Sequence, residues 1–341
     1  MKIKKFKIIL SLFLIIGIAA GGVLGYYDAR LEAAVNNKNG STLTDVKVDD
    51  NLTFNKNVIN ILLVGSDHGA IKGDHGRSDS IMIATVNFKT KELKLTSLMR
   101  DMYVEIPGHG HNKLNAAYAF GGVELLYQTI AKNFGIKIDN YCVVDFSTFE
   151  KVINKVGGVE ISLEEKEAKY LNTTNYISKK KYRNVKVGKQ TLNGAQALGY
   201  CRIRKGGVTT INGLRDDYGR TWRQRTTINA VFNKIKKLPM TDWLDIANVV
   251  LKKVTTDLTN EQITEYLKDA VSLGTTTINQ MQVPVQGYFR SGYNGEYSCG
   301  SCIVMTSGGT AWDTSANAEA LNQFVFDYDG KEEFKYSRSD S

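Results

Sequence analysis

The chain has 341 residues, of which 42% are hydrophobic and 23% are charged, so it can bury a sizeable core in one large domain or two ordinary ones. Its formal charge of +9 invites a nucleic-acid partner, but zinc-finger spacing and RNP aromatics are missing, and we expect no nucleic acid. Anionic lipid, a phosphate substrate or a wall polymer explains the charge equally well. Four cysteines are too few for a disulfide scaffold.

The N-terminal segment predicts a membrane anchor. Lysines at positions 2, 4, 5 and 7 precede an uncharged stretch over residues 8–27, and roughly 20 apolar residues span a bilayer as a helix. The lysines place residues 1–7 in the cytoplasm and the rest of the chain outside the cell, in a single-pass membrane protein. A cleaved signal peptide is the alternative, since Ile18-Ala19-Ala20-Gly21 offers small residues. Residues 28–57 are expected to be a linker.

Three short apolar runs follow the linker, over residues 58–64, 81–86 and 93–99. Each run is aliphatic or β-branched and is bounded by turn residues, which is typical of buried strands. Polar residues follow or precede the strand ends, where α/β sheets tend to place ligands. They are Asp67, Arg77, Asp79, Arg100 and Asp101.

Strands and helices alternate in the rest of the chain. Strands are predicted at 141–145, 159–163 and 276–283, and helices at 115–121, 122–134, 146–156, 192–204, 220–237, 241–254, 259–273 and 314–326. Residues 164–188 are charged and tyrosine-rich, and predict a surface excursion. The pattern predicts an α/β fold over residues 58–330, a three-layer α-β-α sandwich with a central mixed sheet. Residues 331–341 are expected to be a flexible tail.

A dense group of basic residues lies between positions 202 and 225. It contains Arg202, Arg204, Lys205, Arg215, Arg220, Arg223 and Arg225, against only Asp216 and Asp217 in a glycine-rich loop. On a helix that begins near residue 220, we expect Arg220, Arg223 and Gln224 to face one region, near Arg202 and Arg204. Planar, forked donors suit a pyrophosphate. A solvated basic face is the alternative, but Arg77 and Arg100 at strand ends favour a polyanion site.

Two carboxylates, Asp67 and Asp79, bracket one loop and are able to converge on a single point. Mg²⁺, with Mn²⁺ as an alternative, takes one or two carboxylates together with phosphate oxygens. A loop cap with a structural Arg–Asp pair is the other interpretation. The four histidines, at positions 68, 75, 109 and 111, have no paired spacing for zinc and predict exposed loop residues. The sequence leaves open whether Cys299 and Cys302 form a local disulfide or serve a redox or zinc role, whereas Cys142 and Cys201 are expected in the core.

Several polar blocks in order resemble the LytR-CpsA-Psr family of cell-wall enzymes. They are VGSD, RSDSIM, LMRDMYVEIPG, KLNAAYAFGG, VGGV, LNGAQALGYCRIR and DYGRTWRQR, spread over residues 58–237. The resemblance implies that Asp67 and Asp79 hold a metal and that Asp217, Arg220 and Gln224 belong to the site. It also implies that apolar residues between sheet and helices line a slot for a polyprenyl chain. Cys201 stands where the family usually has an aliphatic residue.

The resulting hypothesis is a phosphotransferase with its catalytic domain outside the cell. It would move an anionic glycopolymer (teichoic acid, capsule or secondary wall polysaccharide) from a polyprenyl-pyrophosphate carrier to a peptidoglycan hydroxyl, and release polyprenyl phosphate. Arg100, Asp101 and Asp217 are the expected catalytic residues, and Asp101, Asp217 or the metal-bound carboxylates would accept the hydroxyl proton. The pyrophosphate would bind to Arg77, Arg100, Arg202, Arg204, Arg220 and Gln224.

Three other functions compete with this hypothesis. A polyprenyl-pyrophosphate phosphatase would use the same site with water as the acceptor. An envelope-associated regulator or attenuator needs cytoplasmic nucleic-acid contact, which the predicted anchor opposes. A non-catalytic lipid-binding or polymer-binding module would not need two metal-placed carboxylates.

Overall fold

The computed structural model describes residues 42–43, 46–48, 51–66, 76–238, 254–259, 262, 277–292, 295–297 and 299–326. The predicted tails (1–7 and 331–341), the predicted anchor (8–27) and nearly all of the predicted helices at 241–254 and 259–273 lie outside these residues. Within the described residues, no helix combines the length and the apolar character needed to cross a membrane.

A six-stranded mixed sheet forms the centre of the molecule, in the order β10-β3-β2-β1-β6-β9. Its strands are β1 (Val58–Ser66), β2 (Ser78–Asn87), β3 (Glu92–Leu98), β6 (Asn140–Asp145), β9 (Thr255–Thr256) and β10 (Ile278–Val283). The β1–β2, β2–β3 and β6–β9 pairs are antiparallel, whereas β1–β6 and β3–β10 are parallel. The predicted strands are confirmed, and so is the mixed sheet.

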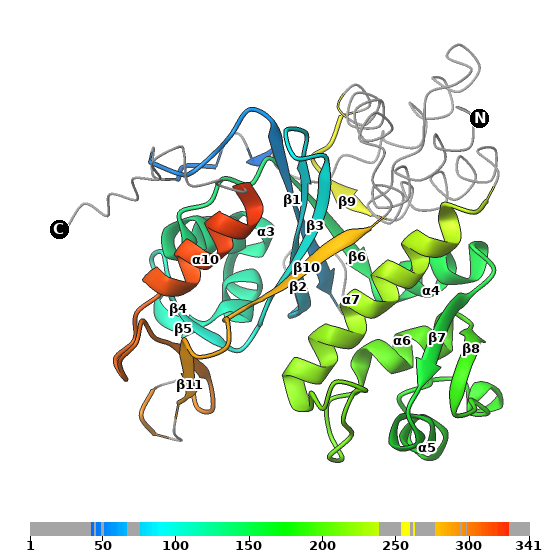
Figure 1. The fold of residues 1–341 in the computed structure, drawn as a ribbon. Coiled ribbons are helices and arrows are strands. Elements are labelled where there is room, and N and C mark those ends of the chain that lie inside the picture. Colours follow the sequence, from blue (N-terminus) through cyan, green and yellow to red (C-terminus); the bar gives the residue numbers. More distant parts are fainter. Residues whose placement is uncertain are drawn as a thin grey trace, which may run out of the picture.

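Alternation along the central strands divides the core into two layers. Ile61 and Met82 pack into one hydrophobic cluster, while their neighbours Leu62 and Ile83 pack into the other, because successive strand residues point to opposite faces. Helices α3 (Leu114–Phe134) and α10 (Ser315–Phe326) cover one face. Helices α4 (Phe146–Lys155), α6 (Gly194–Arg202) and α7 (Asp216–Ile235) cover the other, which gives the three layers (Figure 1).

Two smaller sheets extend this framework. One has the order β11-β12-β4-β5 and contains β4 (Met102–Ile106), β5 (Gly110–Lys113), β11 (Phe289–Ser291) and β12 (Ile303–Met305). The other pairs β7 (Val159–Leu163) with β8 (Gly188–Leu192). Only three residues, Met99, Arg100 and Asp101, separate β3 from β4, so Arg100 and Asp101 lie where the central sheet meets the four-stranded sheet.

The structure corrects two expectations and confirms a third. The predicted surface excursion at 164–188 contains helix α5 (Glu165–Thr173) and the 3-10 turn η3 (Lys180–Tyr182), and its Leu171 and Ile177 are fully buried. Helix α7 begins at Asp216, so Asp217 lies in its first turn and not in a loop. The predicted division into helices at 115–121 and 122–134 is confirmed, because Gly121 and Gly122 have non-helical backbone angles, with φ 64° at Gly122, and kink α3 at this point.

Candidate functional site

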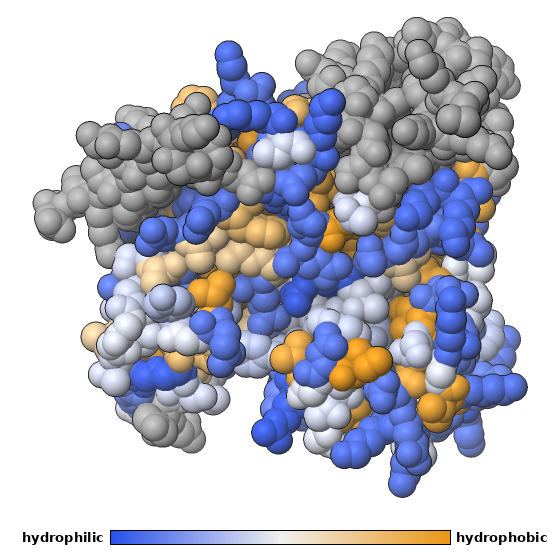
Figure 2. All heavy atoms as spheres, in the orientation of Figure 1, coloured by the Kyte–Doolittle hydropathy of each residue, from blue (hydrophilic) through white to orange (hydrophobic). Residues whose placement is uncertain are grey.

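A cavity of about 300 Å³ lies between the central sheet and the helices of one face. Strands β1, β2 and β6 form its floor, and α4, α6 and α7 contribute its other walls. On the face shown in Figure 2, the surface is indented between the part that carries β4, β5 and β11 and the part where α7 begins.

Helix α7 gives the cavity a polar end and an apolar end. Arg220, Gln224, Ile228 and Val231 all line it, and their spacing of three and four residues places them on one stripe of the helix. This stripe is about 16 Å long at the α-helical rise. The apolar half also faces β1, β6, α4 and α6, through Leu63, Val144, Phe149, Val152, Ile153 and Leu198. The cavity therefore suits a ligand with a charged head and a hydrocarbon chain.

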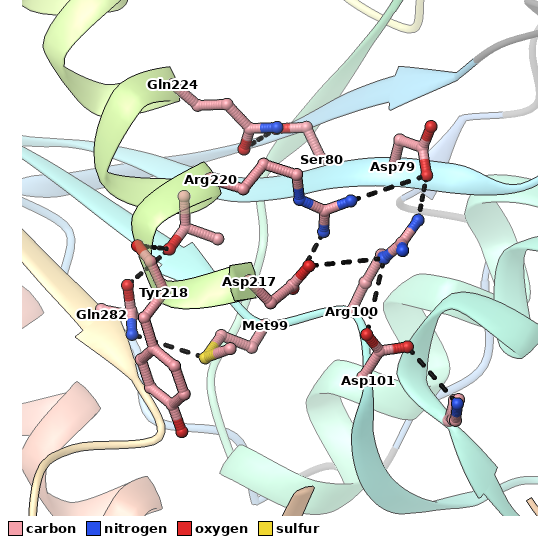
Figure 3. A network of polar contacts seen from close by, with 12 residues as sticks. Asp79, Ser80, Met99, Arg100, Asp101, Asp217, Tyr218, Arg220, Gln224 and Gln282 are labelled. Carbon is pink, nitrogen blue, oxygen red and sulfur yellow. Dashed lines mark hydrogen bonds and ion pairs between the residues drawn. The ribbon is translucent and has the colours of Figure 1, made fainter. Parts of the chain in front are cut away.

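Arg100 is the centre of the charged network at the polar end (Figure 3). Its Nη1 forms an ion pair with Asp79 Oδ1. Its Nε lies 3.7 Å from Asp101 Oδ2 and 3.9 Å from Asp217 Oδ1. One guanidinium, from the β3–β4 junction, thus faces three carboxylates from different elements.

Arg220 supplies the second guanidinium of the network (Figure 3). Its Nη2 donates a hydrogen bond of 2.9 Å to Asp217 Oδ2, and its Nη1 lies 3.8 Å from Asp79 Oδ1. Beside it, the Ser80 hydroxyl donates to Gln224 Oε1 at 3.2 Å. The Nε atoms of Arg100 and Arg220 and the Oδ1 atom of Asp217 are buried without a hydrogen bond. The network therefore retains donor and acceptor capacity for a ligand.

Burial perturbs the ionisation of this network. It raises the pKa of Asp217 above its ordinary range; Arg220 and Arg100 oppose the shift, while Asp101 and Asp79 add to it. Burial also lowers the pKa of Arg220, against the effect of the nearby carboxylates. Both charged groups are partly desolvated and only partly compensated by each other. Perturbed groups that line a cavity are a common property of functional sites.

The structure brings most of the predicted site residues together. Asp79, Arg100, Arg202, Arg204, Arg220 and Gln224 line the cavity, and Asp101 and Asp217 join them through Arg100. Arg202, at the end of α6, holds its guanidinium over the rings of Phe146 (5.2 Å) and Tyr176 (6.0 Å). Arg77 is exposed and is not among the lining residues, so its role stays a prediction. Asp67 lies outside the described residues.

Arg223 does not belong to this site, contrary to the expectation that it faces the same region as Arg220 and Gln224. Its side chain is fully buried, and its Nε donates a 2.7 Å hydrogen bond to Glu167 Oε1 of α5. Its two other nitrogens donate to the backbone oxygens of Ile203 and Val208. Arg223 therefore stabilises the packing of α5, α6 and α7.

Sequence reasoning missed one polar member of the site, Lys113, and named a second, Lys205, only within the basic group at 202–225. Lys113, at the end of β5, lies with its Nζ 3.6 Å from Asp101 Oδ1, and Lys205 lines the cavity beside Arg204. Lys113 is the first residue of the KLNAAYAFGG block, but only the β4–β5 pairing, with Tyr103 opposite Lys113, shows that it lies close to Asp101.

The metal prediction is compatible with the donor set. The described residues contain no group of three or more His, Cys, Asp or Glu side chains arranged around one point. Both contacts of Asp79, to Arg100 and Arg220, use Oδ1, so its Oδ2 is left for another ligand. A carboxylate oxygen of the partly exposed Asp79, which lines the cavity, fits the hard oxygen ligands that Mg²⁺ prefers.

The structure also places two histidines and the four cysteines. His109 is exposed, as predicted, and stacks on Phe120. For His111 the prediction is wrong, since it belongs to β5 and packs against Tyr103 and Trp312. His68 and His75 lie outside the described residues. Cys142 and Cys201 are buried, as expected, and all four cysteines are free thiols in the structure.

Comparison with known proteins agrees with the motifs. The model of the LytR_cpsA_psr family matches residues 25–303. The chain belongs to the LytR-CpsA-Psr family. The regulatory protein MsrR of Staphylococcus aureus is 32% identical over 243 residues, which cover 69% of this chain and 67% of MsrR.

Two further comparisons concern proteins whose names state an activity or a ligand. The polyisoprenyl-teichoic acid–peptidoglycan teichoic acid transferase TagU of Enterococcus faecalis is 33% identical over 290 residues, 84% of this chain and 88% of TagU. The structure of the family protein TagT with bound octaprenyl pyrophosphate lipid superposes with a TM-score of 0.56 at 24% identity, and covers 84% of this chain and 96% of TagT. That likeness shows a shared fold.

Proposed function

We propose that this protein is a phosphotransferase that moves an anionic cell-wall glycopolymer from a polyprenyl-pyrophosphate carrier to a hydroxyl of peptidoglycan. The observation that carries the proposal is the single cavity whose α7 stripe runs from Arg220 and Gln224 to Ile228 and Val231. Its two ends match the two parts of such a carrier, a doubly charged pyrophosphate and a hydrocarbon chain. The named activity of TagU and the lipid named in the TagT structure support the same assignment.

The lipid chain is assigned to the apolar half of the cavity. Side chains from the sheet and from three helices surround it, including Phe149, Ile153 and Val231. A hydrocarbon chain that enters this space loses its contact with water, at about 25 cal/mol per Å² of buried apolar surface. The apolar half of the cavity gives affinity without specificity for the attached sugar, because the hydrocarbon chain is common to many wall-polymer carriers.

The pyrophosphate is assigned to the arginines at the polar end. Arg100 and Arg220 lie within ion-pair distance of the same oxygen of Asp79, so their guanidinium groups converge on one region. Arg202 and Arg204 line the same cavity, and Arg77 is proposed as a further contact. Forked donors at fixed positions stabilise the charge that develops on the departing polyprenyl phosphate.

A divalent cation is proposed at Asp79, with Asp67 as the second ligand and Mg²⁺ as the ion, or Mn²⁺. When bound, it would neutralise charge on the phosphate oxygens. The carboxylates of the network support this assignment, because Asp79 contacts Arg100 and Arg220 through Oδ1 alone and its Oδ2 stays available. An anionic substrate is easier to bind when a cation offsets these carboxylates.

The proposed reaction is a displacement at phosphorus, in which a group of the site accepts the proton of the attacking hydroxyl. An acceptor hydroxyl attacks the phosphorus next to the sugar, the bond from that phosphorus to the bridging oxygen breaks, and polyprenyl phosphate departs with the electron pair. Asp217 is a suitable acceptor of the hydroxyl proton because burial raises its pKa towards neutrality, and Asp101 is the alternative. Peptidoglycan as the acceptor requires the domain to lie outside the cell, held by the anchor proposed at residues 8–27.

The test uses the full chain in detergent, with a short-chain lipid-pyrophosphate disaccharide and soluble peptidoglycan oligomers. Product mass is followed with and without Mg²⁺, for the wild type and for Arg100→Ala. We expect a phosphodiester-linked glycan–peptidoglycan adduct that is lost without the metal and in the variant. Free sugar phosphate as the sole product would show a phosphatase, and tight lipid binding without any turnover would contradict an enzymatic function.

A further inference from the structure

One surface next to the site is not used by the proposed reaction, the solvent-facing side of the four-stranded sheet. The buried side of β4 carries Met102, Val104 and Ile106, which pack into the core beneath α3. The alternating residues Tyr103 and Glu105 therefore point away from the core. Tyr103 pairs with Lys113 of β5, and Glu105 pairs with His111, so all four side chains lie on this outer side.

Aromatic rings cover much of this outer side. Tyr103 stacks on His111 (ring centroids 5.3 Å apart) and lies 4.3 Å from the ring of Tyr297, which belongs to the segment between β11 and β12. Trp312 meets His111 edge-on at 4.7 Å. None of the four side chains is fully buried. We call Tyr103, His111, Tyr297 and Trp312 the aromatic face.

The aromatic face is held in place by polar contacts. The Trp312 indole N–H donates a 2.9 Å hydrogen bond to the backbone oxygen of Tyr103. Arg290 of β11 donates to the Tyr297 hydroxyl at 3.2 Å and forms two hydrogen bonds with Glu296. The rings are thus preorganised, and a ligand that covers them loses little conformational entropy on the side of the protein.

The aromatic face continues directly into the charged network. Asp101 precedes Tyr103 by two residues, which is about 7 Å along an extended strand. Lys113, the partner of Tyr103 across the sheet, contacts Asp101, and Asp101 contacts Arg100. A ligand that lies on Tyr103 and Tyr297 therefore extends towards Asp101, one of the two residues proposed to accept the proton of the attacking hydroxyl.

We infer that the aromatic face binds the glycan strand of the acceptor and holds its hydroxyl next to Asp101. Pyranose rings have an apolar side of C–H groups and a rim of hydroxyls. Tyrosine and tryptophan match this chemistry, since their rings are apolar and their polar tips remain wet. Lys113, Arg290, Glu105 and Glu296 supply charged groups around the rings for the hydroxyl rim. This inference rests on the proposed transferase function and adds the place where its second substrate binds.

The test separates acceptor binding from donor binding and from chemistry. Tyr297→Ala removes one ring at the edge of the aromatic face, Tyr297→Phe keeps the ring without the hydroxyl, and Phe54→Ala removes a remote aromatic ring that is 66% exposed. The readouts are KM for soluble peptidoglycan strands, kcat, and the affinity for polyprenyl pyrophosphate. Binding of the glycan strands alone is also measured by titration calorimetry.

We expect Tyr297→Ala to raise KM for the strands and to weaken their binding by roughly fivefold to tenfold, the scale of one lost stacking contact. We expect kcat and lipid affinity to stay at the wild-type values and Phe54→Ala to behave as the wild type. Tyr297→Phe, which keeps the ring but loses the hydrogen bond from Arg290, should raise KM less than Tyr297→Ala does. An unchanged KM and unchanged strand binding in Tyr297→Ala would overturn the inference. If thermal unfolding shows that this variant is not folded, His111→Ala takes its place, with the same expected result.

The two proposals fail in different ways. Wild-type transfer that Arg100→Ala abolishes, together with a Tyr297→Ala variant that keeps its acceptor KM, would retain the transferase and reject the aromatic site. Absence of transfer in the wild type would reject the transferase. In that case the strand-binding titration still decides whether the aromatic face binds glycan.

Discussion

Helix α7 presents two buried arginines one turn apart, and their surroundings differ in an instructive way. Arg223 is fully buried, and Glu167 and two backbone carbonyls accept hydrogen bonds from its nitrogens. Arg220 faces a cavity, shares its carboxylate partners with Arg100, and has a buried Nε without a hydrogen bond. A buried arginine with satisfied donors stabilises the fold, whereas one with an unused donor at a cavity is available to a ligand.

The largest effect is expected at the satisfied arginine. Arg223→Met leaves Glu167 as an unpaired carboxylate whose pKa burial already raises, and should reduce the free energy of unfolding by about 3–5 kcal/mol. The measurement is urea unfolding of the variant. The double variant Arg223→Met/Glu167→Leu should recover most of the loss, because no charge stays buried alone. If the single variant were stable but impaired in transfer, Arg223 would belong to the site, and the distinction between Arg223 and Arg220 would be wrong.

Arg220→Met should instead damage activity. Loss of one guanidinium that stabilises the developing phosphate charge costs roughly 10²–10³-fold in kcat/KM. The free energy of unfolding should change less than in Arg223→Met, since Asp217 keeps Arg100 within 3.9 Å and is able to take up a proton. The measurements are transfer kinetics and urea unfolding of the same preparation. A large loss of stability with unchanged kcat/KM would show that Arg220 is a second structural arginine.

The protonation of Asp217 gives a prediction that needs no substrate. Its pKa is raised in the folded protein, while the unfolded carboxyl titrates at about 3.9. Between these two pKa values the folded state binds a proton that the unfolded state has released, and this proton uptake by Asp217 stabilises the folded state. The stabilisation is lost as the pH rises through the folded pKa. The difference in unfolding free energy between the wild type and Asp217→Asn should show this fall. A difference that is flat from pH 4 to 8, or that increases, would contradict the assignment.

The smallest effect is expected at Gln224. Gln224→Met keeps the length of the side chain but removes the amide that is proposed to bind the pyrophosphate, together with the acceptor of the Ser80 hydrogen bond. One neutral hydrogen bond contributes about 0.5–1.5 kcal/mol, so the affinity for polyprenyl pyrophosphate should fall roughly threefold to tenfold. The measurement is lipid titration, with Trp222→Phe as a control on the same helix. An effect as large as that of Arg220→Met would mean that Gln224 contacts the reacting phosphate directly.

The sequence predicted five of the six strands of the central sheet, all but β9, and the polar residues at its strand ends. Short runs of aliphatic and β-branched residues at 58–64 and 81–86 were sufficient to predict these strands. Both faces of the sheet are covered, so a one-residue shift would exchange the two cores. Asp79, Arg100 and Arg220 then converge because β2, the β3–β4 junction and the start of α7 meet at one end of the cavity. Each of these residues lies in one of the polar sequence blocks, so the sequence alone indicated them.

Other parts of the site depend on contacts that no local pattern shows. Arg223 and Gln224 are neighbours on α7, and only the position of Glu167 on α5 separates a structural arginine from a cavity residue. Strand β5 (GHNK) has no apolar alternation, and its pairing with β4 defines it. The alternation of Met102, Val104 and Ile106 was a usable signal for β4, and from it for the outward position of Tyr103.

The parallel pairing of β10 with β3 affects the order in which the protein can fold. Ile278 pairs with Leu93, and more than half of the chain lies between them. Where β3 ends, the backbone oxygen of Val283 accepts a hydrogen bond from the amide of Met99, the residue before Arg100. A chain that has been synthesised only as far as residue 277 has β3 as an unpaired edge and no anchor for Met99. Such long-range pairing forms slowly, and we expect a C-terminal truncation upstream of β10 to remove the proposed activity even though every residue of the charged network is present.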